Sequence, residues 1–203
     1  MISINLKVEG HIKIFNPESG EIFVDKKNAI HYENFSEALA NSVANKGEGY
    51  IYEMHFGNGG TSVDPTGVIS YLPPNASGQN ANLYNATYYK IVDNNSILNL
   101  DKLRNKTEVR HTPGTNYSDV LVTCLLDYGE PADQAAYDNS QNLSGQYVFD
   151  ELGLKGYATN GEPGLGKLLT HVIFHPVQKS LNRLIQIDYT VRISSLTNLS
   201  AIG

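Results

Sequence analysis

The chain has 203 residues, of which 40% are hydrophobic and 18% are charged, and its formal net charge is −6 at pH 7. This size and composition suit one globular domain with a sizeable core. The acidic balance argues against a nucleic-acid partner, because there is no basic excess to neutralise phosphates. No apolar run approaches the roughly 18 residues that a membrane-spanning helix needs, so we expect no membrane partner.

Cysteine content and the N-terminal sequence indicate the compartment. Cys124 is the only cysteine and lies in the apolar run DVLVTCLLD, so it cannot form an internal disulfide and is expected to be a small buried hydrophobe. The first residues lack the basic region and long apolar stretch of a secretory signal. We therefore expect the protein to fold in a reducing cytoplasm.

The N-terminal part of the chain predicts strands followed by one helix. Residues 3–15 alternate between apolar and polar side chains, and a short return strand is predicted at residues 22–25. The apolar face of the first strand begins with Ile2, Ile4, Leu6 and Val8. Residues 34–47 predict a helix, with Asn34 as its N-cap and Glu37 completing a capping box.

The rest of the chain predicts strands and long loops. Residues 57–118 are rich in the glycine, proline and asparagine of turns. Further strands are predicted at residues 49–57, 86–93, 106–112, 117–128, 146–154, 167–177 and 182–193. The core is predicted to include Val122, Cys124, Phe149, Ile187, Tyr189 and Val191. Many strands with one helix predict an antiparallel β-sandwich. We expect a single domain over residues 1–203, with an N-terminal strand arm (about 1–20) and a short polar C-terminal tail (about 194–203).

One glycine-rich segment resembles a phosphate-binding loop. Residues 161–169, GEPGLGKLL, fit most of the pattern G-x-x-x-x-G-K-[ST]. However, Leu168 stands where the pattern needs a hydroxyl group, and the apolar residues that follow suit a strand rather than a helix. The preceding LGLKGYATN does not have the pattern of an apolar strand. We interpret the segment as a loop tip and Lys167 as a solvated charge.

Other polar clusters offer weak candidates for chemistry. His171 and His175 would lie roughly 13 Å apart on a strand and could not share a metal ion. A calcium-loop pattern that begins at Asp138 fails at Leu143 and Phe149. A loose acidic neighbourhood could supply a carboxylate pair for glycoside hydrolysis, and its members are Asp127, Glu130, Asp133, Asp150 and Glu151. We predict no catalytic, cofactor-binding or metal-binding residues, with an enzyme that uses this neighbourhood as a lesser alternative.

A resemblance gives a more specific expectation. A strand pattern Phe-x-Glu-[Ile/Leu]-Gly-Leu and a later Pro-x-x-Lys element are matched by Phe149, Glu151, Leu152, Gly153, Leu154, Pro176 and Lys179. Over roughly residues 22–193 the chain resembles small structural proteins of tailed bacteriophage virions. It is also loosely similar to the virion-attachment domains that begin some phage tail fibres. Because the chain has no repetitive shaft, we expect a compact collar, baseplate, tail-adaptor or capsid-decorating part.

The resemblance implies a non-enzymatic virion component, assembled in the host bacterial cytoplasm, that contacts copies of itself and other virion proteins. The rival hypothesis is a module that binds a host-surface glycan or receptor. For assembly, the residues of interest are Ile2, Ile4, Leu6 and Val8. An edge strand with so few charges is expected to pair with its own sheet or with a neighbouring subunit. We predict that residues 1–15 lie at a boundary between subunits related by a rotation axis.

Overall fold

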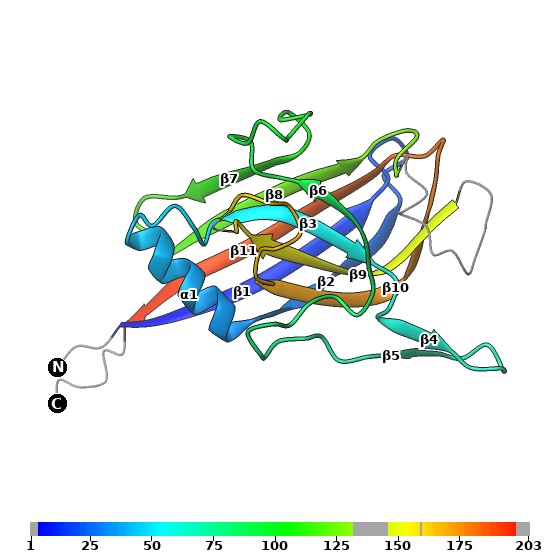
Figure 1. The fold of residues 1–203 in the computed structure, drawn as a ribbon, viewed down its shortest axis with the longest axis horizontal. Helices are drawn as coiled ribbons and strands as arrows, with labels where there is room; N and C mark the ends of the chain where they lie inside the picture. The colour runs from blue at the N-terminus through cyan, green and yellow to red at the C-terminus, as the bar shows by residue number, and fades with distance from the viewer. Residues whose placement is uncertain (1–3, 132–145, 159, 198–203) are drawn as a thin grey trace.

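The computed structural model describes residues 4–131, 146–158 and 160–197, which form a mainly β domain with one helix (Figure 1). The helix, α1, spans Tyr32–Val43. The strands are β1 (Ile4–Phe15), β2 (Ile22–Ile30), β3 (Ile51–Gly57), β4 (Thr61–Val63), β5 (Ile69–Tyr71), β6 (Ala86–Ile91), β7 (Lys106–His111), β8 (Tyr117–Leu126), β9 (Gln146–Gly156), β10 (Thr170–Ser180) and β11 (Ile185–Thr197). No helix in the described part of the chain has the length and hydropathy needed to cross a membrane.

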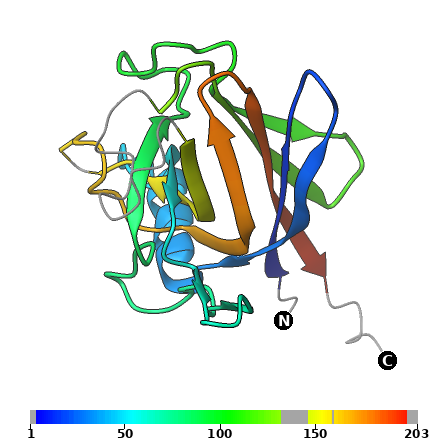
Figure 2. The ribbon, with the colours of Figure 1, turned by 90° about the vertical axis from the view of Figure 1, so that its right-hand side faces the viewer.

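Nine of the strands form one curled antiparallel sheet in the order β6-β3-β9-β10-β2-β1-β11-β8-β7, and β4 and β5 form a separate hairpin. β2 and β10 are joined by only two residue pairs, Thr170 with Ile30 and His171 with Ala29. The sheet therefore folds into a four-stranded layer, β6-β3-β9-β10, and a five-stranded layer that meet at this corner (Figure 2). The fold is the mainly β, sandwich-like antiparallel architecture that the sequence predicts.

The core lies inside the curl, where the alternating apolar side chains of both layers meet. The residues predicted to form it are all buried: Val122, Cys124, Phe149, Ile187, Tyr189 and Val191. Five of these residues come from β8 and β11, whereas Phe149 lies on β9 in the four-stranded layer together with Met54 and Phe56 of β3. The helix α1 adds Phe35 to the same cluster. Each such side chain contributes about 1.5–3 kcal/mol by leaving water.

The helix begins and ends earlier than predicted. Its N-cap is His31 rather than Asn34, because the Nδ1 atom of His31 accepts the backbone N–H of Asn34 at 3.2 Å. Asn34 lies inside the first turn and donates its side-chain amide to the carbonyl of Leu168 at 2.8 Å. The helix stops before Gly47 because Asn45 already has a left-handed backbone, with φ of 52°.

The first and the last described segments of the chain both belong to the sheet. β1 pairs with β11 along its whole length, so residues 4–15 of the expected N-terminal arm are an integral strand. β2 pairs with β1 only from Gly10 onward, which leaves residues 4–9 with a strand partner on one side within the described chain. β11 continues to Thr197 and so includes the start of the expected tail at about 194–203; residues 198–203 lie outside the described residues.

Candidate functional site

The outer face of β3, β9 and β10 holds a group of ionisable side chains beneath the surface loops. All are less than 5% exposed: Glu53, His55, Asp150, Glu151, Lys155 and His171. Most of these side chains point outward because successive side chains of a strand face opposite sides, and their neighbours Met54 and Leu152 point into the core. Asp150 and Glu151 both face outward, and the register between β9 and β10 shifts at this place.

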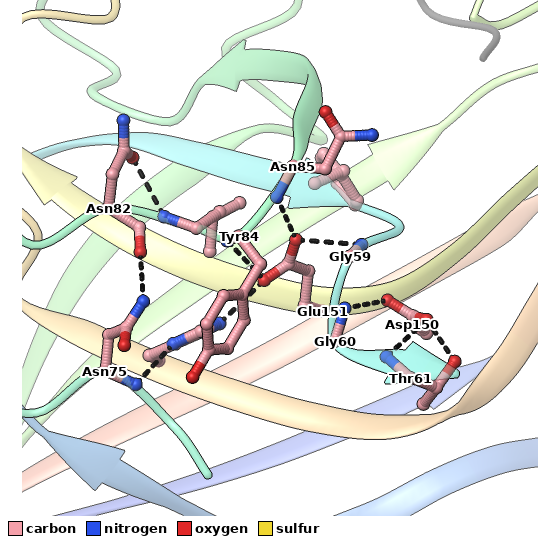
Figure 3. A network of polar contacts seen from close by, with 12 residues as sticks. Gly59, Gly60, Thr61, Asn75, Asn82, Tyr84, Asn85, Asp150 and Glu151 are labelled. Atoms are coloured by element: carbon pink, nitrogen blue, oxygen red, sulfur yellow. Dashed lines mark hydrogen bonds and ion pairs between the residues drawn. The ribbon is translucent and has the colours of Figure 1, made fainter. Parts of the chain in front are cut away.

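Glu151 is the centre of this group, and both of its oxygens are engaged (Figure 3). Oε1 accepts the backbone N–H groups of Gly59 at 3.1 Å and Asn85 at 2.8 Å. Oε2 accepts the backbone N–H of Tyr84 at 2.9 Å and lies 3.0 Å from Nε2 of His171. One buried carboxylate therefore ties both ends of the loop segment at 58–85 to the sheet.

Asp150, which precedes Glu151 on β9, binds the same loop segment at Gly60 and Thr61. Its Oδ1 accepts the backbone N–H of Gly60 at 2.9 Å, and its Oδ2 accepts the backbone N–H of Thr61 at 3.0 Å. The hydroxyl of Thr61 also donates to Oδ2 (Figure 3). Together Asp150 and Glu151 fix the backbone from Gly59 to Thr61, immediately before and at the start of β4.

The protonation state of His171 follows from its two partners. Its Nδ1 accepts the backbone N–H of Asn75 at 2.8 Å, so that atom carries no proton. Nε2 must then carry the proton that is donated to Glu151. His171 is thus a neutral ring that links the segment at Asn75 to the carboxylate.

The two adjacent carboxylates have pKa values shifted in opposite directions. Burial raises the pKa of Asp150, and the hydrogen bonds from Thr61 and Gly60 offset this effect only in part. Burial also acts to raise the pKa of Glu151, but the hydrogen bonds from His171 and from the backbone of Asn85 and its neighbours hold that pKa below the usual value. Glu151 is therefore a stably ionised anchor for N–H groups.

A second cluster fixes the glycine-rich segment. The backbone N–H of Gly164 donates to Oε2 of Glu53 at 2.9 Å, and its carbonyl accepts Nζ of Lys155 at 2.9 Å. Nε2 of His55 lies 2.5 Å from the same Glu53 oxygen. Burial lowers the pKa of His55 and of Lys155.

The glycine-rich segment is the connection between β9 and β10, as a loop-tip interpretation requires. A strand, β10, follows it in place of the helix of a phosphate loop. The strand before it, β9, extends to Gly156, two residues beyond the predicted strand at 146–154. The interpretation that LGLKGYATN lacks an apolar strand pattern is wrong for its first residues, because Leu152 and Leu154 are buried on β9. Lys167 is half-exposed and forms an ion pair with Glu37 at 2.5 Å.

The structure does not gather the acidic neighbourhood into one site. Asp127 pairs with Arg104 at 2.6 Å, and Glu130 pairs with Lys90 at 2.6 Å, whereas Asp150 and Glu151 bind the loops. Asp133 and the candidate calcium loop from Asp138 to Ser144 lie outside the described residues. Among the residues that the structure describes, no group of three or more His, Cys, Asp or Glu could hold a metal ion.

The residues that carry the phage resemblance have architectural positions. Phe149, Leu152 and Leu154 are buried in the core cluster, whereas Glu151 holds the loops. Gly153 leaves room for its neighbours, since a Cβ atom there would lie 2.7 Å from Leu168 and 2.8 Å from the carbonyl oxygen of Thr170. Lys179 is fully buried, and burial lowers its pKa to about 8.

The assembly residues lie at the end of β1. Leu6 is 56% exposed, and Val8 is partly buried against the core. Ile4 begins β1 opposite Thr197, and Ile2 lies outside the described residues.

Sequence reasoning missed Glu53, His55 and the loop glycines as partners of this outer face. The available signal was the charged pattern of β3 and β9, where Glu and His alternate with core residues in strands that are otherwise apolar.

No protein family, curated protein or solved structure matches the chain. Any functional assignment therefore has to come from its own residues and fold.

Proposed function

We propose that the chain is a non-enzymatic structural component of a tailed-phage virion, which forms a symmetric homo-oligomer at the neck, at the tail or baseplate, or on the capsid surface. It would be assembled in the bacterial cytoplasm and would contact other virion proteins. The pattern from Phe149 to Lys179 supports this proposal, because the matched residues build β9 and β10, two adjacent strands of the four-stranded layer.

The observation that carries the non-enzymatic role is the use made of Asp150 and Glu151. These carboxylates were the best candidates for acid–base chemistry, yet their oxygens accept backbone N–H groups of the loops. A general acid or base needs a free oxygen within reach of a substrate proton. Both carboxylates act instead as clamps that make the loops rigid, which suits a surface built for contact.

The first strand supports the oligomeric part of the proposal. Residues 4–9 of β1 present backbone N–H and C=O groups on the side that β2 does not cover. Leu6 is exposed beside this free edge. Natural proteins block such edges or pair them with another strand, so a neighbouring subunit is the partner that we propose.

Particle incorporation tests the proposal. Phage particles are produced with the wild-type chain, with residues 2–9 deleted, or with Leu6→Asp, and the chain is then quantified in purified particles. We expect wild-type incorporation, loss on deletion, and reduced incorporation for Leu6→Asp. Val63→Asp, an equally exposed apolar position on β4, is the matched control and should incorporate normally. Cooperative thermal unfolding of the purified deletion variant shows whether it still folds.

Two results would contradict this function. A wild-type chain that is absent from purified particles but binds saccharides on a glycan array would favour the receptor-binding module. Turnover of a glycoside substrate that is lost in both Asp150→Asn and Glu151→Gln would restore the enzyme hypothesis. Full incorporation of the folded deletion variant would contradict the proposal that residues 2–9 lie at the boundary between subunits.

A further inference from the structure

The loop between β6 and β7 displays large apolar side chains to solvent. The exposed fractions are 89% for Ile97, 48% for Leu98, 97% for Leu100 and 87% for Leu103. Figure 1 shows this segment standing out from the sheet at the top of the view. Single exposed apolar residues are common on protein surfaces, but four within seven residues form a patch of the kind that marks an interaction site. Residues 97–103 are called the apolar loop below.

Polar side chains hold the apolar loop in this shape. Asn99 is buried, and its amide donates to the carbonyl oxygens of Asp93 at 3.1 Å and Asn105 at 2.7 Å. Asn105 is also buried, and its Oδ1 accepts the backbone N–H of Leu125 at 2.9 Å. The loop is thus built with its amides inward and its leucines outward. Because the polar groups fix the backbone, the apolar side chains cannot turn inward without breaking these bonds.

The same chain carries a groove of matching character. It has a volume of about 520 Å³ and lies between α1 and the inner face of β7, β8 and β11. Its apolar walls include Phe35, Leu39, Val109, Val120 and Ile193. These residues define the α1 groove, which is large enough for several apolar side chains.

The charges beside the two surfaces are complementary. Lys102 lies in the apolar loop and makes no ion pair with the described residues, whereas Asp101 beside it pairs with Arg104. Glu48 lines the neighbouring hollow and precedes Gly49, which lines both that hollow and the α1 groove, and the Glu48 carboxylate makes no ion pair within the described part of the chain. An apolar loop seated in the groove would bring an unpaired cation toward an unpaired anion.

We propose that the apolar loop of one copy inserts into the α1 groove of a second copy. The base of the loop, at Asp93 and Asn95, lines the chain's own groove, whereas Leu98 and Leu100 face a different hollow beside Tyr89. The loop therefore reaches the groove of another molecule rather than its own. Each copy then supplies one loop and receives another, and we infer that the contact repeats head-to-tail around a rotation axis and closes a ring. This inference rests on the homo-oligomer of the proposed function and names a second contact within it, besides the edge of β1.

Disulfide trapping tests the contact directly. Leu100→Cys and Ser42→Cys chains are purified separately, mixed and oxidised; Ser42 is exposed and lines the groove. The native Cys124 does not form a disulfide in this experiment, because it is fully buried and burial raises its pKa to about 12. We expect cross-linked dimers in the mixture and little product from either variant alone. Cross-linking of Leu100→Cys only with itself would overturn the head-to-tail arrangement.

Association measurements provide a second readout. Leu100→Asp and Leu103→Asp should each raise the dissociation constant of self-association by roughly tenfold or more, measured by light scattering over a concentration series. Val63→Asp is again the matched control, because Val63 is 63% exposed on β4, outside the apolar loop. Unchanged self-association in both loop variants would overturn the proposal. So would binding of the chain to phosphatidylcholine vesicles that Leu100→Asp abolishes, because this result assigns the loop to a lipid surface.

Two results separate a failure of the loop-in-groove contact from a failure of the proposed virion role. A chain that enters phage particles without forming the mixed cross-link keeps the virion role and overturns the loop-in-groove contact. A chain that forms the mixed cross-link but is absent from particles supports the contact and contradicts the virion role.

Discussion

Replacement of Glu151 by glutamine should destabilise the fold strongly while leaving the shape of the side chain almost unchanged. Glu151 is fully buried and accepts three backbone N–H groups and the Nε2–H of His171. A glutamine has one carbonyl oxygen, which can keep two of these four bonds. Its NH2 group then faces the other two donors and leaves them unsatisfied.

The size of the effect follows from these two orphaned donors. Each buried donor without a partner costs about 1–3 kcal/mol, so we expect a loss of about 4 kcal/mol. This is a large part of the roughly 5–15 kcal/mol by which domains are stable. In a chain of about 200 residues it corresponds to a decrease in melting temperature of roughly 8–16 °C.

Unfolding in urea, followed by circular dichroism at pH 7, measures the loss. Glu21→Gln is the matched control, because it is the same substitution at a residue that forms an exposed ion pair with Arg183. We expect this variant to lose no more than about 1 kcal/mol of unfolding free energy. A Glu151→Gln variant within about 1 kcal/mol of the wild type would refute the clamp.

The pH dependence gives an independent check on Glu151. Its pKa is lowered in the folded state, so its stabilising contribution is present above the ordinary value of 4.5 and is lost as the pH falls through the folded-state pKa. The difference between wild type and Glu151→Gln should therefore narrow below pH 4.5. Asp150, with a raised pKa, contributes in the opposite sense: the folded state binds its proton more tightly, so stability from this group falls as the pH rises above 3.8.

Other changes test the core, the glycine-rich segment and the second buried cluster. Val122→Asp should cost about 3–5 kcal/mol in urea unfolding by burying an unpaired charge, and wild-type stability would contradict the strand assignment. Titration calorimetry with ATP and magnesium should show no heat of binding, since Lys167 is paired with Glu37; micromolar affinity would reverse that interpretation. Because burial lowers the pKa of His55 below 6.5, the unfolded chain binds its proton more readily, so stability decreases as the pH falls below 6.5. His55→Gln should flatten this slope, and an identical slope would show that another group causes it.

Local pattern was sufficient for much of the fold. The alternation in β11 placed Ile187, Tyr189 and Val191 in the core, because strand side chains face opposite sides in turn. The helix cap was missed since a histidine accepts an N–H through Nδ1 only in one tautomer, and the common cap residue Asn34 stood nearby.

The candidate site was harder to predict because its partners are remote in the chain. The backbone donors to Glu151 are 92, 67 and 66 residues away, at Gly59, Tyr84 and Asn85. The sequence identified Asp150 and Glu151 as a pair of acids, but residue identity alone could not show that their oxygens are occupied by backbone groups. Only the curl of the sheet and the course of the loops bring these atoms together.

The clamp also determines which positions can diverge during evolution. Glu151 recognises the backbone N–H groups of Tyr84 and Asn85 and not their side chains, so substitutions at these loop positions leave the anchoring bonds intact. The constraint falls instead on the carboxylate and on Gly57, where a Cβ atom would lie 2.5 Å from Oε1 of Glu151. Related chains could therefore change the chemistry of the displayed surface while retaining the path of the loop.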